Sequence, residues 1–272
     1  MTHEEAVSRL IENYQNIFQK KSGTPDWACK KMNGIDLVHC PIPFVGKHYF
    51  EQPVKILAYA SAENLNNYSG HIDDDVIAVN RHRVYFDMND PESEEFPNAH
   101  IQPINNGALV MTACHIMSRL TEVKVETPAK FLENIAFANY GKYTINTSGE
   151  KRNTDYAGDP EKLRESQEYI IADLEILQPD YIIMVGRMYN GHGKQKCFLD
   201  GIKGSAKIIP IYQFTPTTLN NPRTFRKFPP IRMEELHPAI RRWYGHFHAG
   251  AISSPYFLSV FSYLDDVLSQ VN

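Results

Sequence analysis

The chain has 272 residues, of which 42% are apolar and 22% are charged, and its formal net charge at pH 7 is −4. Such values are typical of a globular protein with a sizeable core, and the slight acidity argues against non-specific nucleic-acid binding over the whole surface. No apolar run approaches the roughly 20 residues that span a bilayer, so the sequence predicts no membrane contact.

The cysteines are widely spaced, and no two of them have C-x-x-C spacing. They are Cys29, Cys40, Cys114 and Cys197. This pattern argues against a zinc ribbon or an iron–sulfur cluster and is typical of reduced thiols in a cytosol. The first residues, "MTHEEAVSRLIENYQ", are acidic and amphipathic, unlike a secretory signal. We therefore expect a cytoplasmic protein without a metal or another cofactor.

The first predicted element is a helix over residues 3–20. Thr2 and Glu5 have the spacing of a capping box, and apolar residues recur behind them at helical spacing. Residues 21–53 show no regular pattern, and "VKILAYA" (54–60) is typical of a short buried strand. Residues 61–106 contain no clear element and include an acidic stretch that is typical of an exposed loop. These patterns divide the chain into a helical N-terminal extension, 1–53, and a domain over 54–272.

In the second part of the chain, predicted helices alternate with predicted strands. The patterns predict helices over 105–120, 160–177 and 256–269, and strands over 134–139, 180–186 and 206–214. Strands with near-continuous apolar cores, separated by helices, are typical of a parallel sheet that is covered on both faces. We therefore expect an α/β domain of three layers, α/β/α, with a central, mainly parallel four-stranded sheet.

A polar loop follows each of the four predicted strands. The loops are "SAENLNNYSG" (61–70), "NYGKYTINTS" (139–148), "GRMYNGHG" (186–193) and "TPTTLNNP" (215–222). The carboxyl ends of parallel strands meet at one edge of the sheet, where open α/β sheets bind ligands. Amides, hydroxyls and aromatic rings with few charges suit a neutral planar ligand such as a nucleobase. The sequence also lacks the glycine-rich phosphate motifs and the G-x-S-x-G nucleophile elbow.

In this order, the four loops resemble the motifs of the uracil-DNA glycosylase superfamily. "YASAENLNN", "FANYGKY", "LQPDYIIMVG" and "IYQFTPTTLNNP" are similar to the motifs after its four strands, the last of which ends in H-P-S or H-P-A. The resemblance covers residues 54–222. It implies a parallel α/β/α domain that acts on DNA, single-stranded or with a lesion, and hydrolyses the N-glycosidic bond of a damaged or deaminated base.

The resemblance implies three catalytic positions. Asn64 matches the asparagine that positions the attacking water, and Glu63 matches the acidic residue of other branches. Thr215 stands where the family has the histidine that stabilises negative charge on the uracil carbonyl. A threonine donates only one hydrogen bond, and loss of a preorganised donor typically costs about 10²–10³ in rate. We therefore expect either a slow or differently specific glycosylase, or a protein that keeps the fold without this activity.

The resemblance also implies contacts to the base and to DNA. Tyr68 would stack on an extruded base, Asn139 would read its Watson–Crick edge, and Tyr140 would lie beside them. Leu219 matches the leucine that fills the space left by the base. Residues 223–242 carry six basic and two acidic side chains, which is a local charge of +4. The expected DNA contacts are Lys142, Leu219, Arg223, Arg226 and Lys227.

Each of these residues also has a structural interpretation. The asparagines are common in caps and turns, the tyrosines can pack the bases of loops, and Leu219 can be a core contact. The basic segment can be a solvated face. His237-Pro238 is a second H-P step and a rival for the missing histidine, although it is more typical of a helix start. His246 and His248 would share one face of a strand, but no third metal ligand is obvious.

Two further functions are compatible with the sequence. The same fold could bind nucleic acid or a free base without cleaving it. Alternatively, the chain could hydrolyse a nucleoside-like small molecule, which its overall acidity favours because DNA is not needed.

Overall fold

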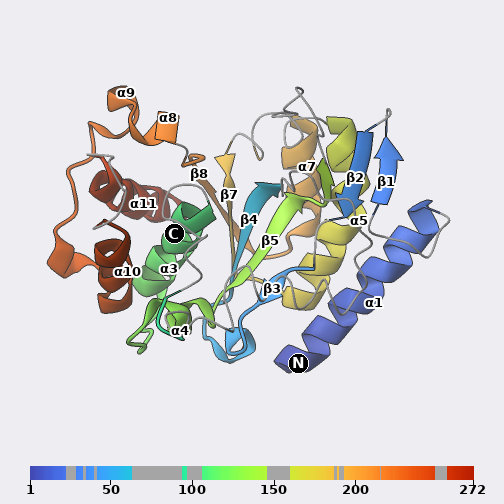
Figure 1. The fold of residues 1–272 in the computed structure, drawn as a ribbon, viewed down its shortest axis with the longest axis horizontal. Coiled ribbons are helices and arrows are strands. Elements are labelled where there is room, and N and C mark those ends of the chain that lie inside the picture. Colours follow the sequence, from blue (N-terminus) through green and yellow to red (C-terminus); the bar gives the residue numbers. More distant parts are fainter. Residues whose placement is uncertain are drawn as a thin grey trace.

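The computed structural model describes residues 1–22, 29–32, 35–39, 42–62, 94–96, 106–145, 160–186, 189, 193–214, 216–248 and 256–272. Its centre is a five-stranded mixed sheet with the order β3-β5-β4-β7-β8 (Figure 1). The strands are β3 (Phe44–Val45), β4 (Ile56–Ala62), β5 (Ala136–Gly141), β7 (Tyr181–Val185) and β8 (Lys207–Ile211). β3 pairs antiparallel with β5, and the other pairings are parallel. The α/β class is confirmed, and β3 is an addition to the expected strands.

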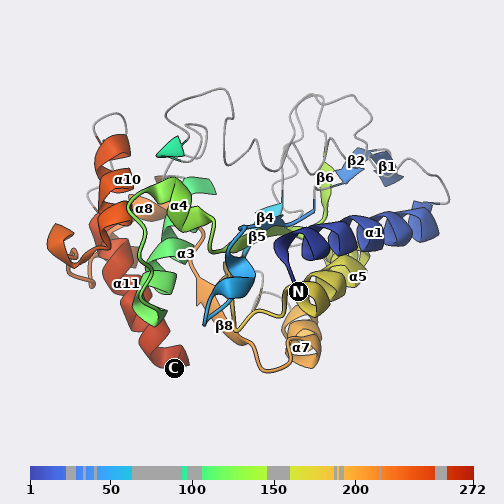
Figure 2. The same cartoon turned by 90° about the horizontal axis from the view of Figure 1, so that it is seen from below.

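Helices cover both faces of this sheet, as Figure 2 shows from below. One face carries α1 (His3–Ser22), α5 (Pro160–Leu177) and α7 (Gly193–Ile202), and the other carries α3 (Asn106–Leu120), α4 (Pro128–Leu132), α10 (Pro238–His248) and α11 (Phe257–Val271). The shorter helices are η1 (Tyr49–Glu51), α8 (Pro216–Leu219), α9 (Pro222–Phe225) and η4 (Met233–Glu235). The described elements therefore form three layers.

The strand residues alternate between two cores because successive side chains point to opposite faces of a sheet. Ile56 and Ala58 of β4 belong to the core under α3, α10 and α11. Leu57 and Tyr59 of the same strand belong to the core under α1 and α5. The sheet has two cores because helices cover both of its faces. The chain runs from β4 to its neighbour β5, and then back past β4 to β7 and on to β8, in the opposite direction across the sheet.

The capping box at the start of α1 is confirmed. The Thr2 N–H donates to the Glu5 carboxylate at 2.8 Å, and the Glu5 N–H donates to the Thr2 hydroxyl at 3.2 Å. Leu10, Tyr14 and Phe18 follow on one face of the helix and are fully buried. α1 packs against α5 and covers the sheet. Residues 1–53, expected as an extension, therefore contribute α1 and β3 to the main α/β unit.

A second, three-stranded antiparallel sheet differs from the sequence-based expectation. It contains β1 (Cys29–Met32), β2 (Ile35–His39) and β6 (Tyr143–Ile145) in the order β1-β2-β6. The sequence predicts irregular structure over 21–53 and a loop that includes 143–145. These strands have three to five residues, too few to show a period, and β6 finds its partner about a hundred residues earlier in the chain.

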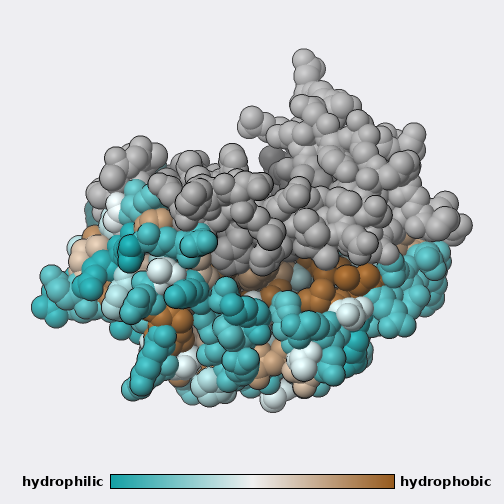
Figure 3. Space-filling view, turned by 60° about the horizontal axis from the view of Figure 1, so that its bottom comes forward, coloured by the Kyte–Doolittle hydropathy of each residue, from teal (hydrophilic) through white to brown (hydrophobic). Residues whose placement is uncertain are grey.

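Most of the other expected elements are confirmed, with ends that differ by at most three residues. The patterns did not predict the short helices α4, α7, α8 and α9. None of the described helices is long and apolar enough to cross a membrane. The described surface in Figure 3 is mostly hydrophilic, with an apolar strip along the border with the grey atoms.

Candidate functional site

The topology defines one edge of the sheet as the candidate site. The chain leaves β4 towards β5 but leaves β7 towards β8, so the connections diverge between these neighbouring strands. Open α/β sheets bind ligands in the crevice at such a switch point, beyond the carboxyl ends of the strands. The ends of β4, β5, β7 and β8 lie together at the top of Figure 1. The topology therefore brings the four expected loops to one edge.

Asn139 is an expected site residue that lies at this edge within a described strand. It belongs to β5, pairs with Ala60 of β4, and is 6% exposed. Because it is two residues from Phe137, its side chain is on the face of the sheet that carries α3. An asparagine amide offers a donor and an acceptor, which are the groups needed to recognise the edge of a base. The expected catalytic residues Asn64, Glu63 and Thr215, and the expected stacking residue Tyr68, lie outside the described residues.

Tyr140 faces the opposite side of the sheet from Asn139. Its ring packs edge-on against that of Tyr59, with 5.4 Å between the ring centroids, and it is 1% exposed. Burial also raises the pKa of its phenol well above the ordinary value. The expectation of a base contact is therefore corrected, and Tyr140 is a core residue.

Lys142 differs most from its expected role. It follows the last residue of β5, but its side chain is fully buried, and its ammonium lies 2.5 Å from the Asp173 carboxylate. The rings of Tyr14 and Tyr59 flank this ammonium with their centroids 5.4 Å and 5.3 Å away. A phosphate of DNA cannot reach this group in the present conformation. The expected DNA contact at Lys142 is therefore corrected to a buried ion pair.

The carboxylate of Asp173 is the centre of this buried network. It accepts hydrogen bonds from the hydroxyl of Tyr14 at 2.6 Å and from that of Tyr59 at 2.9 Å, in addition to Lys142. Burial raises the pKa of Asp173, while the three donors lower it in part. The sequence contains a signal for this site, because Asp173 is three residues after Ile170 and four before Leu177, on the apolar face of α5.

Leu219 also differs from its expected role. It is the last residue of α8, is fully buried, and belongs to the core under α10 and α11. A side chain that wedges into DNA must be exposed, so the interpretation as a core contact fits this structure and the wedge does not.

The basic residues after β8 lie on the surface, as the DNA interpretation requires. Arg223 of α9 and the following Arg226 and Lys227 are all exposed. Arg232 is also exposed but forms an ion pair with Glu235. Three cations near the candidate edge are therefore accessible to a polyanion.

Comparison with family models, with curated proteins and with solved structures finds no match for this chain.

His237 caps a helix and does not replace the missing histidine. One ring nitrogen accepts the backbone N–H of Ala239 at 3.2 Å, and the other donates to the carbonyl of Val123 at 2.8 Å. Its ring packs edge-on against Phe131. Both nitrogens are thus engaged at the start of α10, which confirms the interpretation of His237-Pro238 as a helix start.

The H-x-H pair belongs to α10 rather than to a strand, so the strand that would align the two residues is absent there. The His246 ring stacks on Phe96, with 3.9 Å between centroids. Within the described ranges, no group of three or more His, Cys, Asp or Glu side chains could hold a metal ion.

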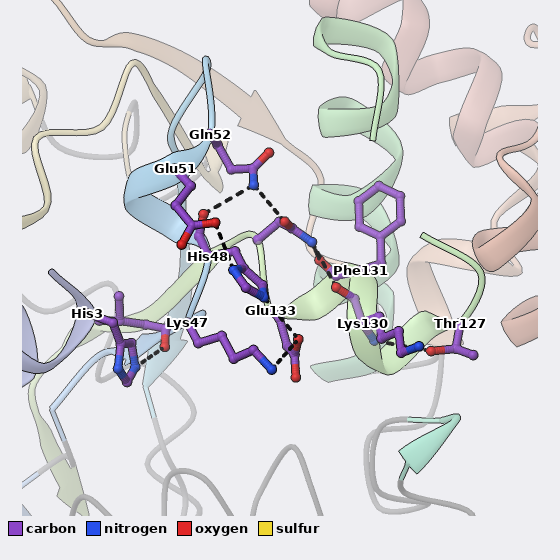
Figure 4. A network of polar contacts seen from close by, with 11 residues as sticks. His3, Lys47, His48, Glu51, Gln52, Thr127, Lys130, Phe131 and Glu133 are labelled. Atoms are coloured by element: carbon purple, nitrogen blue, oxygen red, sulfur yellow. Dashed lines mark hydrogen bonds and ion pairs between the residues drawn. The ribbon is translucent and has the colours of Figure 1, made fainter. Parts of the chain in front are cut away.

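A second polar network lies at the opposite, amino end of β5 (Figure 4). The carboxylate of Glu133 lies 3.3 Å from the Lys47 ammonium, and His48 contacts Glu51 at 2.9 Å. The backbones approach closely here, since a Cβ on Gly46 would meet the Glu133 carbonyl oxygen at 2.2 Å. This network joins β3 and η1 to the end of α4, and we assign it a structural role.

A third polar group joins α3 to α11. The His115 imidazole is 1% exposed and donates to Asp265 at 2.8 Å, while Arg119 donates twice to the same carboxylate, at 3.0 Å each. Burial lowers the pKa of His115 in spite of the opposing effect of Asp265. Burial would raise the pKa of Asp265, but the hydrogen bonds from His115 and Arg119 outweigh it, and the pKa is lowered. No motif in the sequence predicts this cluster.

Proposed function

We propose that this chain binds DNA with its carboxyl sheet edge and hydrolyses the N-glycosidic bond of an unstacked base there. The observation that carries the proposal is the location of Asn139, a nearly buried amide at the end of β5, one strand from the switch point. A buried amide that recognises the edge of a base discriminates well, because a wrong base leaves polar groups unpaired. The resemblance of the four loops to the glycosylase motifs supplies the reaction.

In the proposed reaction, a water oxygen bonds to C1′ of the deoxyribose as the bond from C1′ to the base nitrogen breaks. The bonding electron pair leaves with the base nitrogen, and the attacking water gives up one proton, which ends on the departing base. The products are the free base and an abasic site in DNA. Asn64 and Glu63 would orient the water, and Asn139 would hold the leaving base. Arg223, Arg226 and Lys227, which are exposed, would contact phosphates.

A second function has a specific observation in its favour. Lys142 and Leu219 are both buried, so two of the contacts expected for extrusion of a base from a duplex are not on the surface. A protein that binds single-stranded DNA or a free base without cleaving it does not need these contacts. It would bind DNA with an affinity that falls with salt and would produce no abasic sites.

The test uses the full chain and oligonucleotides that carry uracil, hypoxanthine, xanthine or a mismatched thymine. Abasic sites are measured by alkaline cleavage. We expect product from at least one base, and we expect Asn139→Ala to lower kcat/KM for that base about tenfold or more, since a bidentate contact contributes about 1–3 kcal/mol of discrimination.

Asn134→Ala is the matched control for this variant. Asn134 is equally buried, at 5% exposure, but it lies just before β5 and donates to the carbonyls of Lys130 and Phe131. It should destabilise the protein without changing kcat/KM per folded molecule. Absence of product from all four bases would contradict the hydrolysis of DNA and leave binding without cleavage and hydrolysis of a nucleoside-like small molecule as the functions to test. An equal loss of activity in both variants would remove Asn139 from the site.

A further inference from the structure

We propose that Tyr212 is a stacking platform for a base of single-stranded nucleic acid, next to a phosphate track formed by Arg223, Arg226 and Lys227. The inference rests on the proposed function in that it uses the same sheet edge. It adds the residue that contacts the strand and the form of the nucleic acid. It does not require base excision.

The exposure of Tyr212 is unusual in the part of the chain that the structure describes. Tyr212 is 48% exposed, and every other Phe, Tyr and Trp side chain whose burial is described is buried or half-buried. It directly follows β8, so it stands at the carboxyl edge where a ligand is expected. An aromatic ring that is half open to solvent at such an edge has a free surface on which a base can stack.

Neighbouring aromatic rings hold Tyr212 in place. Its ring centroid is 5.1 Å from that of Tyr263 and 5.9 Å from that of Phe225, which it meets edge-on at 84°. Its backbone N–H donates to the Tyr263 hydroxyl at 3.2 Å. Because these contacts restrict the ring before any ligand arrives, less conformational entropy is lost when a base stacks on it.

The three basic residues lie next to members of the same aromatic cluster. Phe225, fully buried, lies between Arg223 and Arg226 in the chain. The ammonium of Lys227 is 4.8 Å from the ring centroid of Phe228, whose ring is 5.3 Å from that of Tyr263. The chain from 212 to 233 contains no acidic residue. Figure 1 shows α8 and α9 together beyond the end of β8.

A stacking ring beside several cations matches the chemistry of single-stranded nucleic acid. Each nucleotide offers a base with a flat face and a phosphate with a negative charge, and proteins that bind single strands combine aromatic platforms with basic grooves. An acidic peptide would use the cations but not the ring. The inference therefore commits to single-stranded nucleic acid, and the ring is the part that distinguishes the two ligands.

The test measures fluorescence anisotropy of a labelled oligothymidylate and of an abasic oligonucleotide of equal length. We expect Tyr212→Ala to weaken binding of the oligothymidylate about tenfold, since stacking contributes about 1–3 kcal/mol per base. Tyr212→Phe should bind like the natural chain. On the abasic strand, Tyr212→Ala should have no effect, because no base is present to stack.

Arg226→Gln tests the phosphate track. It should weaken binding to both strands and reduce the slope of log affinity against log salt by about 0.7, the value for one phosphate contact on a single strand. Lys207→Gln is the matched control, because Lys207 is an exposed lysine 5.7 Å from the ring centroid of Tyr181 at the opposite end of β8. It should leave affinity and slope unchanged.

The outcomes separate this inference from the proposed function. Weaker binding by Tyr212→Ala, together with no abasic product from the natural chain, supports the stacking platform and contradicts the hydrolysis. Abasic product with unchanged affinity and KM in Tyr212→Ala supports the hydrolysis and overturns the platform. An equal effect of Tyr212→Ala on the abasic strand, or no binding of the oligothymidylate, also overturns the platform.

Discussion

At the residue scale, the most demanding feature is the carboxylate of Asp173. It is fully buried and accepts from Tyr14 on α1, Tyr59 on β4 and Lys142 after β5. A buried charge is tolerated only when it is paired and hydrogen-bonded. The network therefore ties four segments together beneath the candidate site, and the backbone N–H of Lys142 adds a hydrogen bond to Ser166 of α5 at 2.9 Å.

Lys142→Met should lower the free energy of unfolding by about 3–5 kcal/mol, because it leaves the Asp173 carboxylate buried without a cation. The double variant Lys142→Met/Asp173→Asn should be more stable than Lys142→Met alone, since the amide still hydrogen-bonds the two tyrosines without a charge. Urea unfolding of both variants measures this difference. A double variant that is no more stable than the single one would contradict the role of the pair.

At the element scale, α5 contains Asp173 and directly precedes β7 in the chain. The residue after its end, Gln178, has φ = 45°, and its N–H donates to the Leu174 carbonyl at 2.9 Å. This left-handed conformation terminates many helices, usually at glycine, because a Cβ there costs about 1–2 kcal/mol. α5 therefore ends at a strained residue.

Gln178→Gly should raise the free energy of unfolding by about 0.5–1 kcal/mol, after allowance for the larger entropy of glycine in the unfolded chain. Gln178→Ala is the control, since alanine keeps the Cβ and the strain. Denaturant unfolding compares the two variants. Equal stability of the alanine and glycine variants would show that the backbone conformation is not the cause.

At the scale of the whole molecule, the sheet divides the interior into two cores, and α11 closes one of them at the end of the chain. The hydrogen bond between His115 on α3 and Asp265 on α11 joins these two helices, which cover the same face of the sheet. Burial keeps the pKa of His115 below its ordinary value, so the folded protein binds this proton less readily than the unfolded chain. The stability contributed by neutral His115 is present above the unfolded pKa of about 6.5 and is lost as the pH falls below it.

His115→Leu should therefore flatten the decline in the free energy of unfolding between about pH 7 and pH 5. The lowered pKa of Asp265 acts at more acidic pH and does not contribute in this range. Arg119→Gln keeps the imidazole and should retain the decline. Urea unfolding over this pH range measures both slopes, and an unchanged slope in His115→Leu would contradict the assignment.

The predictable parts of the fold are those with local signals. The capping box and apolar spacing of α1, and the apolar runs of β4, β5, β7 and β8, depend on residues close in sequence. β2, β3 and β6 depend on pairing with distant segments, and β1 is held only by its neighbour β2. The same distinction applies to the candidate site, because Asn139 has the position expected from its strand whereas Lys142 and Leu219 do not.

The sequence by itself determined the α/β class and the positions of the four main strands along the chain. Only the tertiary structure decided which polar and apolar side chains at the carboxyl edge of the sheet are accessible. Lys142 finds its carboxylate on α5, 31 residues away, and Tyr212 is held half-exposed by Tyr263, 51 residues away. The physical reason is that exposure and charge pairing are properties of surroundings brought together by packing, which no local pattern encodes.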